Sequence, residues 1–460
     1  MYRTTRLHWL YFSPCFFYDV FTPPCSHGVS IMNNIDKIYK KLRWQIIITT
    51  FLTYTVMYIS RKAFAAAAPL LMQDIGMTAV QFGTASSIYY ILYGISKFSS
   101  GLLADRINPR LFLAPVLLVV AVINVGIGMS NNVTVLLSLY CLTAVAQGCG
   151  FPPIAKAISQ WYSKSERGGW YSLWNTSHNV GGALAPLIAS GVIEYTGNWR
   201  YAFYVPAAIT AVQAIISAIF MRAKPEKYGL PNVGEWKKDS KQLAINKRSE
   251  SGLSMWQMFT RYIVNNPIIW LAIGGDLCIY VIRTVTNDWV SVYFVKELGW
   301  DLVKSNSLVA WFEVGGILGG LTSGIISDKF FNADRWKTIL IYSFVLIGGM
   351  IGVALTIHVH YYLVAICFFI IGAGIYAPQM LFALGIIEAS HADGAGAATG
   401  LKGGVTYIGA AMAGAPIALI EKAYSWNGVF MLMGAIAILL VVLTIGIIGM
   451  DKHYNRSNAK

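Results

Sequence analysis

Charged side chains are scarce in this chain. Only 12% of its 460 residues are Asp, Glu, Lys or Arg, against roughly 25% in soluble domains. The hydrophobic fraction is 56% and the mean hydropathy is +0.55. Apolar runs of about 20 residues recur, each long enough to cross a hydrocarbon core about 30 Å thick. These features exclude a soluble globular protein and predict an all-α membrane protein that crosses the bilayer many times.

Cysteine is also rare, and so are the residue sets on which enzymes depend. The six cysteines form no CxxC pair, and four of them lie inside apolar runs. Such spacing indicates neither a disulfide framework nor a zinc centre, and we expect no metal or other cofactor. The chain has no nucleotide-binding P-loop and no recognisable set of nucleophile, base and orienting residue, so we do not expect an enzyme.

Acidic residues are outnumbered, with 21 Asp and Glu against 35 Lys and Arg and a net charge of +14. A basic excess can indicate nucleic-acid binding or basic cytoplasmic loops, and the positions of the basic residues distinguish the two. The basic residues lie before the first apolar run, after the second, between the fourth and fifth, after the sixth and after the eighth. The positive-inside rule assigns these loops, and with them both termini, to the cytoplasm. The excess of positive charge therefore indicates how the chain is oriented in the bilayer. We expect no nucleic-acid partner.

Twelve apolar runs divide six and six about the one long hydrophilic stretch. The division predicts an N-terminal bundle over residues 44–221 and a C-terminal bundle over 266–449, joined by a cytoplasmic linker at 222–265. Residues 1–43 would form a cytoplasmic leader and 450–460 a cytoplasmic tail. The predicted spans are 44–69, 79–103, 111–130, 133–160, 168–193, 199–221, 266–294, 305–327, 337–357, 359–386, 395–420 and 427–449.

The beginning of the chain fits neither a span nor a secretion signal. It mixes aromatic residues with Pro, Cys and His, and it lacks the apolar core and small-residue cleavage site of a signal peptide. We therefore expect the biological start at Met32, which precedes an ordinary polar leader. Otherwise residues 1–31 would be a disordered tail.

A short motif repeats between the halves. GLLADR at 101–106 recurs as GIISDK at 324–329, an offset of 223 residues, and each copy closes the second span of its half. Two six-span halves related by a parallel repeat resemble the major facilitator superfamily, in which substrate binds near mid-membrane between the halves. The motif is similar to a cytoplasmic loop element of that superfamily that ties helix ends together; ordinary loop solvation is the alternative. Its predicted gate residues are Asp105, Arg106, Asp328 and Lys329.

Two arginines lie inside predicted spans at equivalent places. Arg61 and Arg283 each stand about 17 residues into a span, roughly 25 Å along a helix. Their offset of 222 residues is within one of the motif offset. A cation at such a depth costs at least about 2.5–3.5 kcal/mol, which marks it as a functional candidate. Each follows a tyrosine, Tyr58 or Tyr280, by three residues on the same helix face.

Pseudo-symmetry between the halves would set the two guanidinium groups face to face across a central cleft. Snorkelling to the interface explains one arginine near a helix end but not a matched pair. In a low-dielectric cleft the two charges repel each other strongly. A tetrahedral dianion fits their forked donors and neutralises them. The pair therefore predicts a site for phosphate or an organic phosphate.

Other ionisable residues interrupt the spans. Lys97 would add a positive charge below the arginine pair, although a lysine near a helix end can also snorkel. Lys402 is a further intramembrane cation without an acidic partner on its own helix, and Glu313 is its predicted cross-helix partner or else a structural residue. Asp288 is expected to orient Arg283 or a neighbouring helix.

The fifth span carries a polar face about ten residues, or roughly 15 Å, inside the membrane. Trp174, Asn175, His178 and Asn179 share this face, which we expect to line a cavity. The alternative is a hydrogen-bonded histidine buried in a seam between helices. The glycine pair at 181–182 beyond it predicts that another helix approaches closely.

The segment from Arg167 to Gly182 fits the pattern R-G-x5-W-N-x2-H-N-x-G-G and resembles the organophosphate:inorganic phosphate antiporter family. YISRK, YGISKF, ADRINPR and WFE match the family as well, so the resemblance covers about residues 35–450. It implies that the matching arginines bind the phosphate group, that the lysine of helix 2 and the histidine of helix 5 contribute, and that tyrosines line the pore. The predicted substrate-binding residues are Arg61, Arg283, Lys97, His178, Tyr54, Tyr58, Tyr93, Tyr280, Asn175, Lys402 and Tyr407.

The resemblance leaves the substrate open. Members exchange glycerol 3-phosphate, hexose phosphates or phosphoglycerates for inorganic phosphate, and this chain is most similar to the bacterial hexose-phosphate carriers. Those carriers pair a lysine of helix 11 with an aspartate three residues earlier. Here Lys402 is kept but Thr399 replaces the aspartate, so an uncompensated charge would favour a more anionic substrate.

We expect uptake of a hexose phosphate in exchange for inorganic phosphate by alternating access, in a monomer in the bacterial inner membrane. One alternative is an antiporter for another organophosphate, such as glycerol 3-phosphate. The other is a membrane sensor of external hexose phosphate that passes its signal to a histidine kinase and transports weakly.

Overall fold

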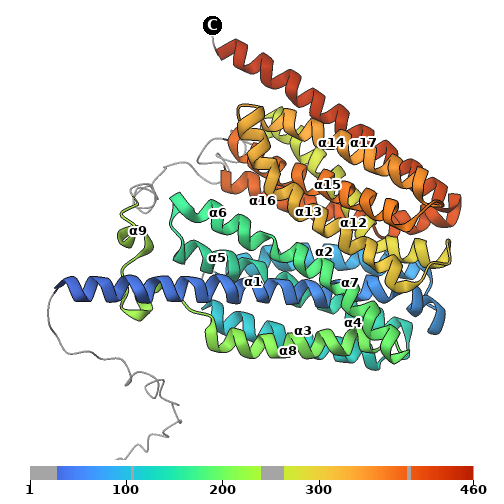
Figure 1. Ribbon diagram of the computed structural model, residues 1–460, viewed down its shortest axis with the longest axis horizontal. Helices are drawn as coiled ribbons and strands as arrows, with labels where there is room; N and C mark the ends of the chain where they lie inside the picture. Colours follow the sequence, from blue (N-terminus) through green and yellow to red (C-terminus); the bar gives the residue numbers. More distant parts are fainter. Residues whose placement is uncertain (1–27, 105–107, 240–263, 391–394, 459–460) are drawn as a thin grey trace, which may run out of the picture.

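The computed structural model describes residues 28–104, 108–239, 264–390 and 395–458, and all regular structure in these ranges is helical (Figure 1). Most helices run side by side in two groups, α1 to α8 and α12 to α17. The bounds of the first group and of the two short helices that follow it are α1 Gly28–Asp74, α2 Ala79–Ala104, α3 Pro109–Met129, α4 Val133–Gly148, α5 Phe151–Trp161, α6 Lys164–Asn175, α7 Ser177–Thr196, α8 Tyr201–Phe220, η2 Pro225–Tyr228 and α9 Val233–Trp236. The bounds of the second group are α12 Pro267–Lys296, α13 Leu302–Phe330, α14 Arg335–Thr356, α15 Tyr361–Ala389, α16 Ala395–Met412 and α17 Ala415–Asn458.

Two of the predicted spans each consist of a pair of helices. The fourth span breaks at Cys149–Gly150, between α4 and α5. Proline at 152 and 153 explains the break, because proline has no backbone N–H to continue the helical hydrogen bonds but is well suited to the first turn of α5. The fifth span changes from α6 to α7 at Thr176.

The predicted eleventh span, 395–420, is wrong at its end. The helix α16 stops at Met412, α17 begins at Ala415, and helical geometry is lost again at Ser425, whose φ is 57°. Pro416 stands in the first turn of α17, where its missing N–H costs nothing. Because the residues on both sides of this break are apolar, hydropathy alone did not reveal it.

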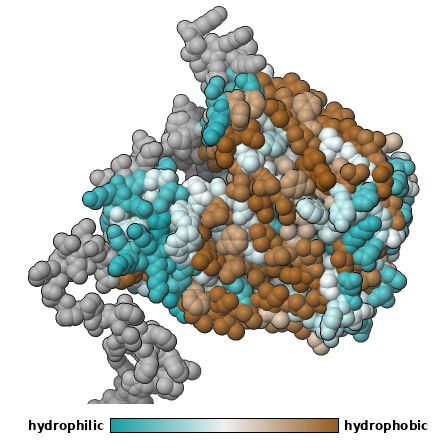
Figure 2. Space-filling model, in the orientation of Figure 1, coloured by the Kyte–Doolittle hydropathy of each residue, from teal (hydrophilic) through white to brown (hydrophobic). Residues whose placement is uncertain are grey.

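The outer surface is apolar in the way that a lipid environment requires. Figure 2 shows a broad hydrophobic band around the middle of the molecule with hydrophilic residues toward both ends. Leu111, Val122 and Met431 are each at least 70% exposed, which a protein surrounded by water would avoid. By length and hydropathy, eight described segments can cross a membrane, and one of them, Ala398–Asp451, includes parts of both α16 and α17.

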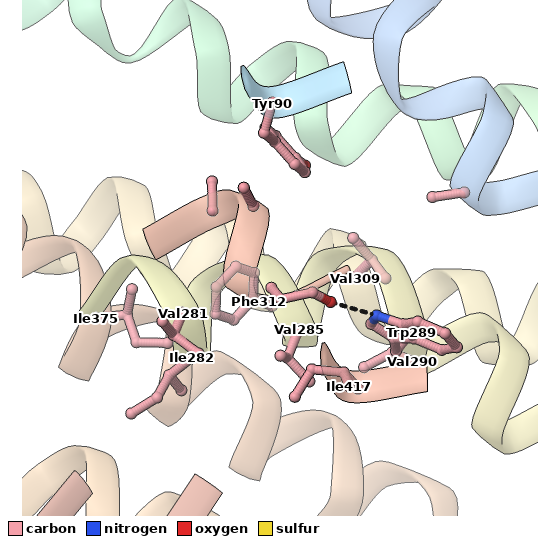
Figure 3. Close-up of a cluster of buried hydrophobic side chains, with 14 of the residues drawn as sticks. Tyr90, Val281, Ile282, Val285, Trp289, Val290, Val309, Phe312, Ile375 and Ile417 are labelled. Atoms are coloured by element: carbon pink, nitrogen blue, oxygen red, sulfur yellow. Dashed lines mark hydrogen bonds between the residues drawn. The ribbon is translucent and has the colours of Figure 1, made fainter. Parts of the chain in front are cut away.

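Each group has its own internal packing. In the first group, α1 packs against α7 and α8, and α3 packs against α8; in the second, α15 packs against α13 and α14, and α12 against α17. Contacts between the groups join α1 to α12, α7 to α13, and α2 to both α16 and α17. Figure 3 shows the apolar core beside this boundary, where Trp289 Nε1 donates to the Ala413 carbonyl over 2.7 Å and Tyr90 approaches from α2.

The backbones of the two groups meet at one end. We call the end where η2 and α9 lie the linker end and the opposite end the far end (Figure 1). The helix α2 starts at the far end, where a Cβ added to Gly83 would lie 2.8 Å from the carbonyl oxygen of Gly414. One turn later, Ser87 Oγ donates to the Ala411 carbonyl over 2.5 Å. Direct backbone contact therefore joins the two groups at the far end.

Replacing Gly83 with valine tests this contact. We expect overpacking to destabilise the protein by about 1–3 kcal/mol and to lower its thermal unfolding midpoint in detergent. Gly191→Val is the matched control, because a Cβ there meets nothing within 4 Å. Equal midpoints for the two variants would contradict the close approach.

Candidate functional site

Arg61 points into the interior from α1 and is 8% exposed. Its Nε donates to the hydroxyl of Tyr89 over 3.1 Å, and its guanidinium carbon lies 3.8 Å from the ring centre of Tyr93. One terminal nitrogen, Nη2, is buried without a hydrogen-bond partner. A buried charged donor without a partner is costly, so this nitrogen is directed at a position where a ligand oxygen would be favoured.

Arg283 occupies the corresponding place on α12 and is also 8% exposed. Its Nε donates to the hydroxyl of Tyr376 over 3.0 Å, and its Nη1 donates to Gln379 Oε1 over 3.1 Å. Tyr376 in turn donates to Glu313 Oε2 over 2.7 Å. The arginine is thus held by neutral oxygens, and Tyr376 lies between it and the carboxylate of Glu313.

Both arginines line one cavity of about 40 Å³ between the helix groups. The structure therefore brings together two residues that are 222 positions apart in the chain. Among the described residues, no carboxylate oxygen lies within 4.0 Å of either guanidinium group. The other lining residues are Tyr58, Lys62, Tyr90, Tyr280, Thr284, Asn287, Tyr407 and Ala410.

Lys62 is a site residue that the sequence reasoning missed. Its Nζ lies 2.9 Å from Asp288 Oδ1, and Tyr90 donates to the other oxygen of this carboxylate over 2.7 Å. Asp288 was expected to orient Arg283 or a neighbouring helix; it contacts the neighbouring helices α1 and α2 and does not pair with Arg283. The signal in the sequence was a second cation directly after Arg61 in an apolar run.

The predicted pairing of Lys402 with Glu313 is wrong. Lys402 Nζ lies 3.2 Å from Asp276 Oδ1, and Thr406 donates to Asp276 Oδ2 over 2.9 Å. The pairing follows from packing, because α16 lies against α12, which carries Asp276. The expectation of an uncompensated charge on Lys402 is therefore also wrong. Asp276 precedes Arg283 by seven residues, two helical turns, and that spacing could have placed it on the cavity side.

Lys97 does not line the arginine cavity. Its Nζ donates to the hydroxyl of Tyr407 over 3.0 Å and lies 4.1 Å from the ring centre of Phe151. It lines a separate, larger cavity between α2 and α5. Tyr93, predicted on the same face, packs 5.0 Å from the Tyr407 ring.

His178 and Asn179, on the polar face of the fifth span, have different surroundings. His178 Nδ1 contacts the Asn175 carbonyl, and its ring lies 5.6 Å from those of Tyr58 and Tyr376. Its Nε2 is buried without a partner. Asn179 Nδ2 donates to Glu313 Oε2 over 2.8 Å, which joins α7 to α13. The expectation that this face lines a cavity is wrong for Asn179, because its side chain lies in a seam between helices.

The aromatic part of this face is packed as well. Trp174 is fully buried, and its ring lies 4.9 Å from that of Tyr54 and 5.8 Å from that of Phe151. Neither Trp174 nor Tyr54 lines the arginine cavity. The predicted close approach at residues 181–182 is confirmed, because a Cβ added to Gly182 would lie 2.8 Å from Glu313 Oε1.

The repeated motif is described only in its second copy, since Asp105 and Arg106 lie outside the described residues. Asp328 Oδ1 lies 2.5 Å from Arg335 Nη1, and Arg335 Nη2 lies 3.2 Å from Glu388. These contacts join the ends of α13, α14 and α15. Lys329 is exposed.

Sequence similarity places the chain in a family. A model described as Major Facilitator Superfamily matches residues 50–414. The chain belongs to the major facilitator superfamily. It is 37% identical over 403 residues to the membrane sensor protein UhpC of Escherichia coli, covering 88% of this chain and 91% of that protein. It is 34% identical over 434 residues to a probable hexose phosphate transport protein of Chlamydia trachomatis, covering 92% and 95%.

A third relative is the glycerol-3-phosphate transporter of Bacillus subtilis, 32% identical over 423 residues, with 89% of this chain and 93% of that protein covered. Together these relatives assign the chain to the organophosphate:inorganic phosphate antiporter family. Among solved structures, a bacterial homologue of the lysosomal transporter Spinster matches with a TM-score of 0.71 at 14% identity, covering 88% of this chain and 96% of that chain. The chain is thus a multi-pass membrane transporter with this superfamily's fold, and not an enzyme.

A double-variant cycle tests the Asp276–Lys402 pair. Asp276→Asn leaves a buried ammonium without its partner, so we expect a loss of about 3–5 kcal/mol in unfolding free energy. Adding Lys402→Met removes the stranded charge and should restore much of the lost stability. Thermal unfolding midpoints of the four proteins in detergent give the result. Additive effects of the two changes would show that the residues do not interact.

Proposed function

We propose that this chain takes up a hexose phosphate in exchange for inorganic phosphate by alternating access, with the linker end in the cytoplasm. The observation that carries the proposal is the cavity shared by Arg61 and Arg283, one from each helix group, with no carboxylate of the described residues paired to either. Guanidinium groups bind phosphate oxygens through paired N–H donors. A phosphate between them would bridge the two halves of the transporter.

The formal charges around the cavity support a dianionic ligand. Two of the three carboxylates each pair with one lysine, and the third accepts hydrogen bonds from the neutral donors Asn179 and Tyr376. With Lys97, which lines the neighbouring cavity, included in the count, two positive charges remain in excess, which matches the charge of a phosphate dianion. The cations are Arg61, Lys62, Lys97, Arg283 and Lys402, and the carboxylates are Asp276, Asp288 and Glu313.

The same charges favour exchange over one-way transport. An unoccupied cavity leaves two guanidinium groups that repel each other at low dielectric, so closing the empty transporter around them is costly. Bound phosphate removes this cost in both directions of the cycle. The gradient of the counter-substrate then drives uptake.

In the described conformation the helix groups are joined beyond the arginines. The Lys62–Asp288 ion pair links α1 to α12, and Gly83 meets Gly414 at the far end. With basic loops at the linker end, the positive-inside rule assigns this end to the cytoplasm. With this orientation, the far-end contacts close the cavity on the periplasmic side. These contacts must break before an external substrate can reach the arginines.

Hexose phosphate is the proposed substrate on two grounds. The chain is 34% identical to a probable hexose phosphate transport protein, and it carries an intramembrane lysine at Lys402. Since Asp276 neutralises that lysine, the earlier reason to expect a more anionic substrate disappears. The bundle boundaries, the inner-membrane location with cytoplasmic termini and the monomeric state stay predictions within this proposal.

A sensor is the second candidate, because the chain is also 37% identical to the membrane sensor UhpC of E. coli. A sensor would bind hexose phosphate at the same cavity, signal to a histidine kinase and exchange slowly. Purified protein in phosphate-loaded proteoliposomes separates the candidates. Rapid counterflow of glucose 6-phosphate supports the antiporter, whereas binding without counterflow supports the sensor. Faster counterflow of glycerol 3-phosphate than of any hexose phosphate would replace the proposed substrate.

Arg61→Lys and Arg283→Lys test the binding geometry in the same assay. Lysine keeps the charge but loses the paired donors, a loss of about 1.5–3 kcal/mol, so kcat/KM for exchange should fall roughly ten- to a hundredfold. Arg222→Lys, outside the cavity after α8, is the matched control and should exchange normally. Normal exchange by both cavity variants would contradict bridging by the arginine pair.

A further inference from the structure

The arginine cavity also carries an unpaired hydrogen-bond acceptor. Among the described residues that line this cavity, two buried side-chain atoms have no hydrogen-bond partner. One is the donor Arg61 Nη2, which the proposed phosphate would satisfy. The other is the acceptor Asn287 Oδ1, in a residue that is only 4% exposed. The anionic oxygens of a phosphate are acceptors themselves, so they cannot satisfy this second atom.

The orientation of the Asn287 amide is fixed by its own helix. Its Nδ2 donates to the carbonyl of Arg283, one turn earlier in α12, over 3.1 Å. The reverse orientation would set two carbonyl oxygens against each other, so the amide oxygen is the atom left for another partner. Because a buried acceptor without a partner is costly, Asn287 Oδ1 favours a ligand that has a hydrogen to donate.

Neighbouring donors of the cavity are bound elsewhere. Lys62 and Tyr90 line the same cavity, but both donate to Asp288, over 2.9 Å and 2.7 Å. The cavity volume of about 40 Å³ is enough for water, and water can donate to Asn287 Oδ1 between substrates. A substrate that displaces this water must supply a hydroxyl of its own, because otherwise the acceptor loses its partner.

Asn287 and Arg283 keep the same spacing throughout the proposed cycle, because they belong to one helix. Four residues correspond to about 6 Å along the axis of α12. The cavity must widen to admit a whole organic phosphate, but a separation of the helix groups does not change this spacing. A phosphate group bound to Arg283 therefore leaves the organic part of the same molecule within reach of Asn287.

We propose that Asn287 selects a phosphate ester with a free hydroxyl, such as a sugar or polyol phosphate, by accepting a hydrogen bond from that hydroxyl at Oδ1. The proposal rests on the proposed function, because it concerns the ligand of the arginine cavity. The arginines bind the phosphate group, and Asn287 contacts the organic part. An alkyl phosphate without a hydroxyl leaves the acceptor unpaired and binds more weakly. Inorganic phosphate needs only the arginines, so its affinity does not depend on Asn287.

Asn287→Leu tests this selection, because leucine has the same branching as asparagine but no acceptor. Affinities of the purified full-length protein for glucose 6-phosphate and for inorganic phosphate are measured by titration calorimetry in detergent. We expect Kd for glucose 6-phosphate to rise roughly tenfold and Kd for inorganic phosphate to stay unchanged.

Thr286→Val is the matched control. It removes an equivalent bond to the helix backbone, from Thr286 Oγ1 to the Ile282 carbonyl over 2.8 Å, but Thr286 does not line the cavity. Both Kd values should therefore stay unchanged in this variant. The same rise in Thr286→Val as in Asn287→Leu would assign the effect to the helix and overturn the proposal.

Monodeoxy analogues of glucose 6-phosphate identify the hydroxyl that Asn287 contacts. Loss of that hydroxyl should weaken binding to the wild type roughly tenfold. The same loss should leave binding to Asn287→Leu unchanged, since the hydrogen bond is already absent there. Additive losses for every analogue would show that no sugar hydroxyl interacts with Asn287 and would overturn the proposal.

Inorganic phosphate can also carry a hydroxyl, on its protonated oxygen. An equal rise in both Kd values in Asn287→Leu would assign the acceptor to the phosphate group and overturn selection of the organic part. No rise in either value would overturn it as well. If Asn287→Leu does not fold, Asn287→Thr serves instead. Its hydroxyl can keep the bond to the Arg283 carbonyl, but the amide oxygen is absent, so Kd for glucose 6-phosphate should rise in the same way.

Binding by the wild type separates the two proposals. If the wild type binds both ligands and any of the contradicting results is found, only the role of Asn287 is rejected. If the wild type binds neither glucose 6-phosphate nor inorganic phosphate, the proposed function itself is rejected.

Discussion

Repulsion between two buried guanidinium groups is the constraint on which the rest of this structure depends. Arg61 and Arg283 line one small cavity, and the acids nearby are committed to other partners. Like charges held at low dielectric are tolerable only if an anion can join them. In the proposed function, a ligand that supplies two negative charges stabilises the approach of the two helix groups, so that its binding is coupled to their movement.

The surrounding ion pairs fit this arrangement because each removes a charge that would otherwise compete for the ligand. Asp276 neutralises Lys402 within the second helix group, whereas Asp288 neutralises Lys62 across the boundary between the groups. In the proposed alternating-access cycle the first pair persists while the helix groups move, whereas the second stretches or breaks when the far end opens. An ion pair within one helix group therefore fixes a charge throughout the proposed cycle. An ion pair between the groups also stabilises the conformation in which they touch.

The sequence predicted those features that depend on periodicity or symmetry. The meeting of Arg61 and Arg283 at one cavity followed from the repeat, and the close approach at residues 181–182 followed from glycine in an apolar helix. The partner of Lys402 could not be predicted, because hydropathy does not say which helices are neighbours, and α16 packs on α12. The end of α16 at Met412 was missed for a similar reason, since apolar residues continue beyond it.

A density map of the protein with bound inorganic phosphate tests the central claim most directly. The account predicts one tetrahedral density between Arg61 and Arg283, with oxygens about 2.7–2.9 Å from guanidinium nitrogens of both residues. Density on one arginine alone, or an arginine side chain turned toward lipid, would contradict it.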